Sequence, residues 1–348
     1  MLTLARRSGA APRAAPFSGS DPRPILGTRI MSTDLITIGI TCFDAEDSVE
    51  KAVRSAQEQT WPSLEIVAVD DCSSDGSWSI LERLASADGR MRIIRHSVNC
   101  GVGAARNTVL QHASGAFVAF FDDDDVSRPQ RLAVQHRRIV DYERATGAKS
   151  VLGYTATAQL YPNGAGVYSP CLGADATPAP SGQDVARLIL LGKPAGGGRG
   201  VCPTSSLMAR REVLGSVGGF DEDLRRHEDT DLNLRLALQG AHFAGLSDPL
   251  VKQTMTFTRD KTVLAERQSA FHLLEKHEEV LRRWQWYEFS YLWCEMKFAW
   301  LEGGLKTALP IAARMFLASP GKMARKALWA LPNRKHYRRH KYSSDERA

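Results

Sequence analysis

The sequence lacks the features that mark a membrane-spanning or secreted chain. None of its uncharged apolar runs reaches about 18 residues, the length that indicates a transmembrane helix, so none is predicted. Residues 1–30 contain no continuous apolar stretch, which excludes an ordinary secretory signal. No internal repeat is present either. These absences leave a globular protein, and its hydrophobic and charged fractions, 43% and 24%, are ordinary for that class.

The six cysteines show no Cys-x-x-Cys spacing of the kind that binds a metal. Most stand next to the ends of predicted strands, and we interpret them as reduced thiols, which predicts a cytoplasmic protein. They are Cys42, Cys72, Cys100, Cys171, Cys202 and Cys294.

Positive charge is concentrated at the two ends of the chain. Residues 1–31 carry five Arg and one Asp, and residues 320–348 carry nine Lys and Arg against two acids. Because the whole chain is only +6, the body between them is acidic. An acidic body argues against a nucleic-acid partner. The basic C-terminal segment is either a solvated tail or a segment that contacts an anionic membrane surface.

Residues 1–33 are expected to be a disordered basic leader. Met31 directly precedes the first strand pattern and is an alternative start, and an Arg-rich transit peptide is a further interpretation.

From Leu35 onward, apolar strand patterns alternate with helical patterns. This alternation predicts an α/β fold with a Rossmann-like, mostly parallel sheet flanked by helices. The predicted strands are 35–41, 64–69, 91–95 and 116–121, and the predicted helices are 45–58, 74–85, 103–111 and 130–146.

The later part of the chain is less regular. Residues 160–182 read as loop or hairpin, 196–200 as a flexible loop, 205–209 as a short strand, and 265–301 as a long, helical and aromatic stretch. We therefore divide the chain into one α/β domain over 34–258 and a helical, aromatic and basic extension over 259–348.

The segment Phe-Phe-Asp-Asp-Asp-Asp at 120–125 is the strongest functional signal. It follows an apolar strand, and open α/β sheets bind ligands at the carboxyl ends of their strands. Crowded carboxylates suit a hard divalent cation such as Mg²⁺ or Mn²⁺, which commonly bridges to phosphates. A solvated acidic loop is the alternative.

Two further polar segments follow predicted strands. Residues 70–77 (Asp-Asp-Cys-Ser-Ser-Asp-Gly-Ser) could hydrogen-bond a nucleoside or simply cap the next helix. Residues 99–107 (Asn-Cys-Gly-Val-Gly-Ala-Ala-Arg-Asn) fit a dinucleotide fingerprint poorly, because Arg106 replaces the third glycine. Arg106 could instead bind a diphosphate or pair with the acidic cluster.

A pair of acids opens the helix predicted after His227. Glu228 and Asp229 could compensate the helix dipole, or one of them could act as a general base toward an acceptor hydroxyl.

In this order and spacing, the motifs resemble glycosyltransferase family 2. Residues 38–77 look like that family's opening strand–helix–strand, and 99–107 resembles its Asn-x-Gly-x-x-x-Ala-Arg-Asn turn. Residues 120–125 resemble its metal-binding Asp-x-Asp signature, and 218–236 resembles its acceptor-side segment ending in Glu-Asp. The resemblance covers about 34–250 and implies the GT-A fold for residues 34–258.

The resemblance also implies roles for individual residues. Thr41, Phe43 and Asp71 would hold the nucleotide base, and Asp123 would meet the ribose. Arg106 would support the base or the adjacent acidic site. Asp124 would bind Mn²⁺ or Mg²⁺, with Asp122 or Asp125 as an outer ligand. Asp229 would be the general base, with Glu228 beside it.

The chain departs from the family pattern in three places. Thr41-Cys42-Phe43-Asp44 replaces the usual Pro-Thr-Tyr-Asn, which removes two polar groups near the base. Asp123 replaces a small residue between the metal-site acids. The family's Arg/His-containing strand is only loosely echoed by 252–259.

The implied activity is inverting transfer of a sugar from a nucleotide diphosphate-sugar, a UDP-sugar above all, to the hydroxyl of a glycan or lipid-linked acceptor. Surface polysaccharide or glycolipid assembly is the expected setting, and loop 160–200 is expected to shape acceptor choice. A non-catalytic nucleotide-sugar-binding protein of the same fold is the alternative. A nucleotidyltransferase would leave the Glu-Asp helix without a role.

Four of the seven tryptophans fall within 284–300. An aromatic stripe recurs at helical steps and either packs on the domain or a partner protomer, or lies at the head-group level of a membrane. With residues 312–317 and the basic segment 322–341, it could give peripheral contact with the cytoplasmic face. The stripe is Trp286, Phe289, Trp293, Met296 and Trp300.

Overall fold

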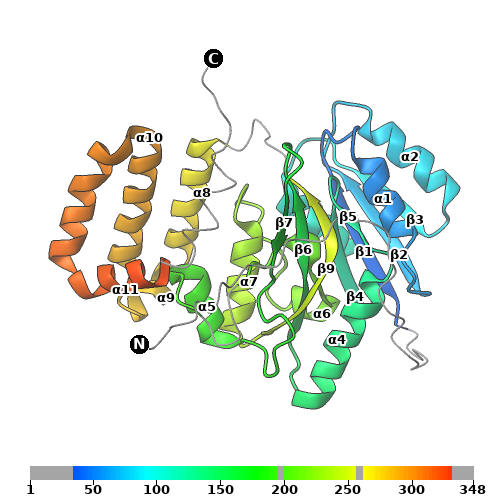
Figure 1. Cartoon of the computed structure of the whole chain (residues 1–348). Coiled ribbons are helices and arrows are strands. Elements are labelled where there is room, and N and C mark those ends of the chain that lie inside the picture. The colour runs from blue at the N-terminus through cyan, green and yellow to red at the C-terminus, as the bar shows by residue number, and fades with distance from the viewer. Residues whose placement is uncertain (1–33, 195–199, 256–261, 331–348) are drawn as a thin grey trace, which may run out of the picture.

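A computed structural model describes residues 34–194, 200–255 and 262–330, and in these ranges the core of the protein is one nine-stranded sheet (Figure 1). The strand order is β3-β2-β1-β4-β8-β6-β9-β5, with β7 paired to β6. The strands are β1 (Ile36–Cys42), β2 (Leu64–Asp70), β3 (Met91–Arg95), β4 (Phe117–Asp122), β5 (Val126–Ser127), β6 (Val151–Leu160), β7 (Gly166–Ser169), β8 (Met208–Arg210) and β9 (His242–Thr254).

Parallel pairing dominates the part of the sheet that carries the motifs. Strands β3, β2, β1 and β4 form three consecutive parallel ladders, and β6 pairs in parallel with β9. The short strands β5, β7 and β8 add antiparallel ladders. The predicted fold class is confirmed, and the four predicted N-terminal strands lie where the pattern put them to within a residue.

Helices cover both faces of the sheet. Helices α1, α2 and α4 pack on one face, whereas α3, α5, α6 and α7 pack on the other, each side with its own apolar core. The helices of this domain are α1 (Val49–Gln57), α2 (Ser77–Ala87), α3 (Val102–His112), α4 (Arg131–Thr146), α5 (Gly182–Leu191), α6 (Arg211–Gly215) and α7 (Glu228–Leu238). A 3-10 turn (Thr204–Ser206) precedes β8.

Sequence patterns did not predict β6 or β9, which form the most extensive strand pairing in the molecule. They carry several of the residues buried in the sheet, so their apolar runs lack a clean alternation. For residues 160–182 the prediction left a loop or a hairpin open. The structure has a hairpin at the start of this stretch, where β6 and β7 pair antiparallel.

The stretch predicted to be helical over 265–301 is helical, but it is divided. Three helices occupy this stretch: α8 (Val263–Lys276), α9 (Glu278–Arg283) and α10 (Tyr287–Ala318). Between α9 and α10, Gln285 adopts a left-handed conformation with φ of 60°. The amide of Trp286 then donates to the carbonyl of Leu281, which closes α9 as a left-handed capped end. Helical periodicity does not reveal this stop because glycine, the usual residue there, is absent.

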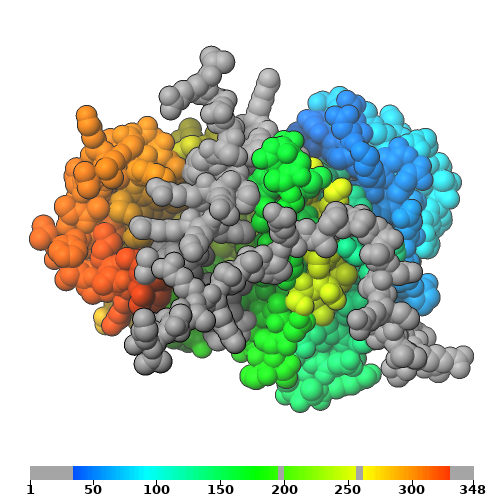
Figure 2. All heavy atoms as spheres, in the orientation of Figure 1, coloured from blue at the N-terminus to red at the C-terminus, as the bar shows by residue number. Residues whose placement is uncertain are grey.

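The C-terminal extension is a separate helical lobe beside the sheet domain (Figures 1 and 2). Helices α8, α9, α10 and α11 (Pro320–Ala330) share a third apolar core, to which Leu191 of α5 also belongs. Four residues of the aromatic stripe pack in or against this core, and Trp300 stays 52% exposed. The first part of the stripe therefore packs within the extension itself.

No helix in the described ranges is both long enough and apolar enough to cross a bilayer. All six cysteines are free. The predicted leader, the loop 196–199 and Arg259 lie outside the described residues.

Candidate functional site

The predicted site residues gather at one edge of the sheet. In the parallel ladders, Thr41 of β1 is level with Asp122 of β4, and Cys42 is level with Asp70 of β2. Three strand ends therefore deliver their following residues to the same place, as expected for the carboxyl edge of an open α/β sheet. Helices α3 and α7 add Arg106 and Glu228 from the covering layer.

Asp71 holds the loop that follows β3. Its Oδ2 accepts the amide of Gly101 at 2.7 Å, and its Oδ1 accepts the amide of Cys100 at 2.9 Å. A further hydrogen bond of 2.7 Å joins Oδ1 to His96 Nδ1. The carboxylate is buried, with 2% exposure. Asp71 is thus a structural anchor of the turn before α3. A nucleotide base could hydrogen-bond only to the lone pairs of the Asp71 carboxylate that these contacts leave free.

Phe43 is positioned for stacking. Its ring is 47% exposed, while its backbone amide donates to Asp123 Oδ2 at 3.0 Å. This bond ties the turn after β1 to the turn after β4. Thr41 is nearly buried at the end of β1 and lies behind this turn. The pair of turns forms a platform with an exposed aromatic ring, which is the geometry required to stack a planar base.

The aspartates at 122–125 crowd one another. Burial, with the charges of Asp124 and Asp122, raises the pKa of Asp123 to about 7. Burial and the charges of Asp122 and Asp124 raise the pKa of Asp125 to about 8. Asp125 is buried and its Oδ1 accepts the amide of Thr254, whereas its Oδ2 has no partner among the described residues. The raised pKa values show that the positive groups around the cluster do not fully neutralise the negative charge of its carboxylates.

Arg131 provides a positive charge behind the cluster. It is fully buried at the start of α4, and its guanidinium donates to Ser127 Oγ at 2.8 Å and to the carbonyl of Phe120 at 2.9 Å. The same group lies 4.3 Å from the centroid of the Phe121 ring. Burial lowers the pKa of Arg131, but a guanidinium remains charged at neutral pH. Arg131 was not predicted from the sequence, because an arginine in a helical pattern normally reads as solvent-exposed.

Arg106 joins the two acidic motifs. Its Nη1 donates to Glu228 Oε1 at 2.6 Å, and its Nη2 donates to Asp122 Oδ1 at 3.2 Å. Burial lowers the pKa of Arg106, but the charges of Asp122 and Glu228 outweigh this effect and raise the pKa overall. Of the two roles left open for Arg106, pairing with the acidic cluster is the one observed. Its side chain is 6% exposed, so the bridge is inside the protein.

Glu228 and Asp229 are adjacent in sequence and differ in their surroundings. Burial raises the pKa of Glu228, and the ion pair with Arg106 offsets only part of that effect. Asp229 Oδ1 accepts the amide of Thr230 at 2.6 Å and its hydroxyl at 3.1 Å. The side chain of Asp229 is partly exposed. Glu228 is therefore engaged by a cation, and Asp229 is the acid of this pair that faces a more open environment.

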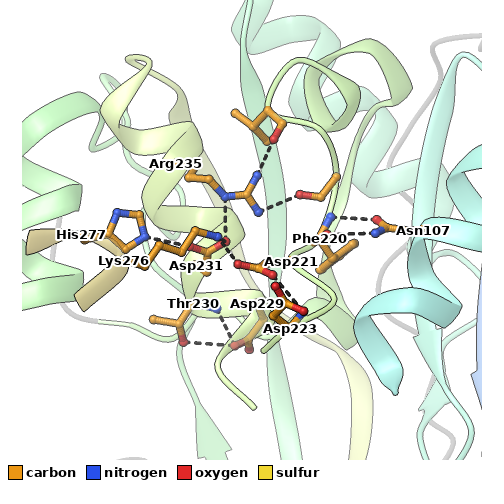
Figure 3. A network of polar contacts seen from close by, with 12 residues as sticks. Asn107, Phe220, Asp221, Asp223, Asp229, Thr230, Asp231, Arg235, Lys276 and His277 are labelled. Atoms are coloured by element: carbon orange, nitrogen blue, oxygen red, sulfur yellow. Dashed lines mark hydrogen bonds and ion pairs between the residues drawn. The ribbon is translucent and has the colours of Figure 1, made fainter. Parts of the chain in front are cut away.

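Asp231, one turn further along α7, connects the site to the extension (Figure 3). It is fully buried, and its Oδ1 is hydrogen-bonded to His277 Nε2 at 2.7 Å. Its Oδ2 accepts from Arg235 at 2.7 Å and Lys276 at 3.0 Å. Lys276 also pairs with Asp221. The sequence contains Asp231 within the Glu-Asp-Thr-Asp segment, but nothing in its spacing indicates partners about 45 residues away.

The acidic cluster fits a divalent cation. A partnerless buried oxygen on Asp125 and the raised pKa values of Asp123 and Asp125 mark a site short of positive charge. Mg²⁺ typically takes only one or two protein carboxylates and completes its shell with phosphates and water. Within the described ranges, three potential ligands converge only at Asp71, His96 and Cys100, so the aspartates at 122–125 do not form a closed cage. An open, carboxylate-only site suits a cation shared with a diphosphate.

The comparison with protein families agrees with this geometry. Residues 37–159 match the family described as glycosyl transferase family 2. This part of the chain belongs to glycosyltransferase family 2. The matched segment contains the platform, Arg106 and the aspartate cluster, whereas the Glu-Asp helix lies beyond it.

Curated relatives of the family 2 domain act in glycan assembly according to their names. The chain is 35% identical over 125 residues to TuaG of Bacillus subtilis, named for teichuronic acid biosynthesis. It is also 35% identical over 92 residues to WfaP of Escherichia coli, a UDP-Glc:alpha-D-GlcNAc-diphosphoundecaprenol beta-1,3-glucosyltransferase. These matches span 36% and 26% of this chain, and 48% and 36% of the two relatives. The chain thus matches less than half of the length of either.

Solved structures of similar shape extend over most of this chain. Residues 1–349 of TarS from S. aureus, in complex with UDP-GlcNAc, align with a TM-score of 0.54 and 18% identity, covering 86% of this chain and 92% of that one. Mannosyltransferase PcManGT from Pyrobaculum calidifontis, in complex with GDP-Man and Mn²⁺, aligns with a TM-score of 0.51 and 19% identity, covering 87% and 81%. At this identity the likeness establishes the fold, which is GT-A.

Proposed function

We propose that this protein is an inverting glycosyltransferase that moves a sugar from a nucleotide diphosphate-sugar to an acceptor hydroxyl. The observation that carries the proposal is the bridge formed by Arg106 between Asp122 and Glu228. Arg106 contacts one acid of each motif, Asp122 of the Asp-x-Asp segment and Glu228 of the Glu-Asp segment. The two motifs lie more than 100 residues apart in sequence and meet at this guanidinium. A group-transfer site needs a donor-side acid cluster next to an acceptor-side base, and this arrangement supports that assignment.

The donor is proposed to be a UDP-sugar. The relative WfaP is named for UDP-Glc and the TarS structure contains UDP-GlcNAc, whereas PcManGT contains GDP-Man. In the proposed complex the base stacks on Phe43 beside Thr41, near the Asp71 anchor, and Asp123 binds the ribose. Asp123 already accepts the amide of Phe43, so a ribose hydroxyl would share that carboxylate.

Asp124 and Asp122 are proposed to hold Mn²⁺ or Mg²⁺, with Asp125 behind them. A divalent cation supplies the charge neutralisation that turns a nucleotide diphosphate into a good leaving group. The positive charges of Arg131 and Arg106 limit the repulsion among the carboxylates of the site. Arg106 also orients Glu228 and, through it, the first turn of α7.

Asp229 is proposed to take the proton from the acceptor hydroxyl as that oxygen attacks the anomeric carbon from the face opposite the diphosphate. A general base must lie within hydrogen-bond reach of the proton that it removes. Asp229 meets the local requirement better than Glu228, because no cation binds it among the described residues and its side chain is partly exposed. A single displacement of this kind inverts the anomeric configuration.

The acceptor is proposed to be a glycan or lipid-linked sugar used in surface polysaccharide or glycolipid assembly, in line with the names of the relatives. The protein would then work at the cytoplasmic face of a membrane and touch it through the extension. Large apolar side chains are exposed on α10 and α11, as a peripheral contact would require. They are Trp300, Leu305, Leu309, Phe316, Leu317 and Leu328.

The test is transfer and hydrolysis from a panel of UDP-, GDP- and dTDP-sugars with Mn²⁺ or Mg²⁺, and then with EDTA. Membrane extract supplies the acceptor, and Asp124→Ala and Asp229→Asn are run beside the native protein. We expect metal-dependent transfer from one donor. Asp229→Asn should lose at least about 100-fold, the range typical of a lost acid–base group, and Asp124→Ala should lose activity because the diphosphate is no longer neutralised by the metal. Asp223→Asn is the matched control, because Asp223 is exposed and lies before the same helix.

Two outcomes would contradict parts of the proposal. Donor binding without turnover under every acceptor condition would favour a non-catalytic nucleotide-sugar-binding protein of the same fold. Full activity of Asp229→Asn would be compatible with a glycosyltransferase but would refute Asp229 as its general base.

A further inference from the structure

The extension and α5 together enclose a basic pocket far from the aspartate cluster in sequence. The pocket has a volume of about 460 Å³ and lies where α5, α9 and α11 come side by side (Figure 1). Its described lining includes four cationic side chains and no acid: Arg187, Lys193, Arg283 and Arg325. None of these residues contributes to the proposed transfer site.

The positive charge of the pocket is only partly compensated. Asp184 is shared by Arg187 at 4.0 Å and Lys193 at 3.7 Å. Arg283 pairs with Glu279 at 3.2 Å, but that carboxylate is 89% exposed. Exposed pairs of this kind are weak and exchange readily with other anions. Arg325 makes no hydrogen bond or ion pair with any of the described residues. In the described part of the chain, the four cations of the pocket therefore pair with only two acids, Asp184 and Glu279, and neither acid lines the pocket.

Tryptophan side chains build the walls. The guanidinium of Arg187 lies 5.3 Å from the centroid of the Trp284 ring, which restricts where its donors can point. Trp286 and Trp329 stack on each other with centroids 5.5 Å apart, and this contact attaches α11 to the start of α10. Lys326 donates to the carbonyl of Leu191 at 2.6 Å and attaches α11 to α5. Arg187, Arg283 and Arg325 thus stand on helices that these contacts hold together, and Lys193 follows the end of α5.

Apolar surface lies directly beside these cations. Leu328 is 63% exposed and stands three residues after Arg325, hence on the same face of α11. Arginine forks onto phosphate oxygens, and tryptophan favours the head-group level of a membrane. We propose that this pocket binds the phosphate of an anionic lipid head group, with the acyl chains directed toward the exposed side chain of Leu328 on α11. This inference rests on the membrane contact proposed above and names the group that is recognised there.

The experiment is calorimetric titration of the full-length protein with dihexanoylphosphatidic acid below its micelle concentration. Glycerol 1-phosphate and dihexanoylphosphatidylcholine are titrated in parallel. Arg325→Gln and Arg283→Gln each remove one cation from the pocket. Arg314→Gln is the matched control, since Arg314 is an exposed arginine of α10 that does not line the pocket. A lost charge-assisted hydrogen bond should weaken binding roughly tenfold, and the control should change it less than about twofold.

Saturable binding of the phosphatidic acid that is weakened in both pocket variants and not in the control supports the proposal. No saturable binding, or an equal loss in Arg314→Gln, would overturn it. Glycerol 1-phosphate binding as tightly as the lipid would overturn the lipid assignment and identify a soluble phosphate as the ligand. Because the probe is monomeric and no nucleotide sugar is present, a negative result would not count against vesicle binding or glycosyl transfer, which have their own assays.

Discussion

Arg106 of α3 and Glu228 of α7 form a buried ion pair of 2.6 Å between residues 122 positions apart. The second arm of the same guanidinium reaches Asp122 at the end of β4. One side chain therefore sets the distance between the acids proposed to hold the donor metal and the acids proposed to activate the acceptor. A change at Arg106 should disturb folding and both halves of the site at once.

Arg106→Gln should destabilise the protein by about 3–5 kcal/mol, because it leaves Glu228 buried without a counter-charge. Urea unfolding followed by circular dichroism measures this loss. The matched control is Arg54→Gln, which breaks an exposed pair with Glu50 and should cost less than about 1 kcal/mol. Adding Glu228→Gln to the first variant should restore part of the stability. Equal losses of unfolding free energy in Arg106→Gln and Arg54→Gln would show that the buried bridge stabilises the protein no more than an exposed ion pair does.

The contact between α7 and the extension should make stability depend on pH below about 4. Burial raises the pKa of Asp231, but the hydrogen bond from His277 and the charges of Arg235 and Lys276 outweigh it and hold the pKa at about 2. A carboxyl with a depressed folded-state pKa contributes stability that is present above its unfolded value, near 3.9, and is lost as pH falls toward 2. This lowering of the Asp231 pKa corresponds to about 2–3 kcal/mol of stability.

The measurement is urea unfolding of the native protein and of Asp231→Asn between pH 5 and pH 2.5. The difference in unfolding free energy between the two should be largest at pH 5 and should shrink as pH falls. Asp223→Asn, an exposed carboxyl before the same helix, should follow the native curve. A constant difference across this range would mean that Asp231 acts through packing and not through its charge.

Asp71→Asn should loosen the turn before α3. The carboxylate accepts the amides of Cys100 and Gly101 on separate oxygens, and an amide side chain offers only one acceptor. An unsatisfied buried donor costs about 1–3 kcal/mol. Hydrogen exchange of these two amides should accelerate by roughly tenfold or more, and UDP affinity should fall. Asp88→Asn, at a partly buried surface pair with Arg90, should leave exchange at 100–101 unchanged. Unchanged exchange in Asp71→Asn would refute the anchoring role.

The aromatic stripe should divide into a structural part and a surface part. Trp286 is 8% exposed in the core of the extension, so Trp286→Ala should cost about 3–5 kcal/mol. Trp300 is 52% exposed, so Trp300→Ala should cost less than about 1 kcal/mol and reduce sedimentation with anionic vesicles. Thermal unfolding and vesicle sedimentation measure the two effects. Unaltered vesicle binding in Trp300→Ala would exclude this residue from the membrane contact.

Local pattern alone predicted the parallel half of the sheet and the edge at which the site lies. Strand and helix periods have distinct signatures, and the acidic and glycine-containing segments follow directly after those strands, so their meeting at one edge required only the handedness of the crossovers. The resemblance to family 2 then supplied the expected residue roles, which remain predictions, and the family comparison confirms the resemblance itself over 37–159.

Long-range pairing was decided only by the tertiary structure. The partners of Arg106 and Asp231, the burial of Arg131 and the closing of α9 at Gln285 depend on which surfaces meet after folding. A sequence lists charges in order, but an ion pair needs two elements brought within about 4 Å by packing. Residue type and spacing therefore determined where chemistry could occur, whereas the fold decided that Glu228 pairs with Arg106 and that its neighbour Asp229 stays partly exposed.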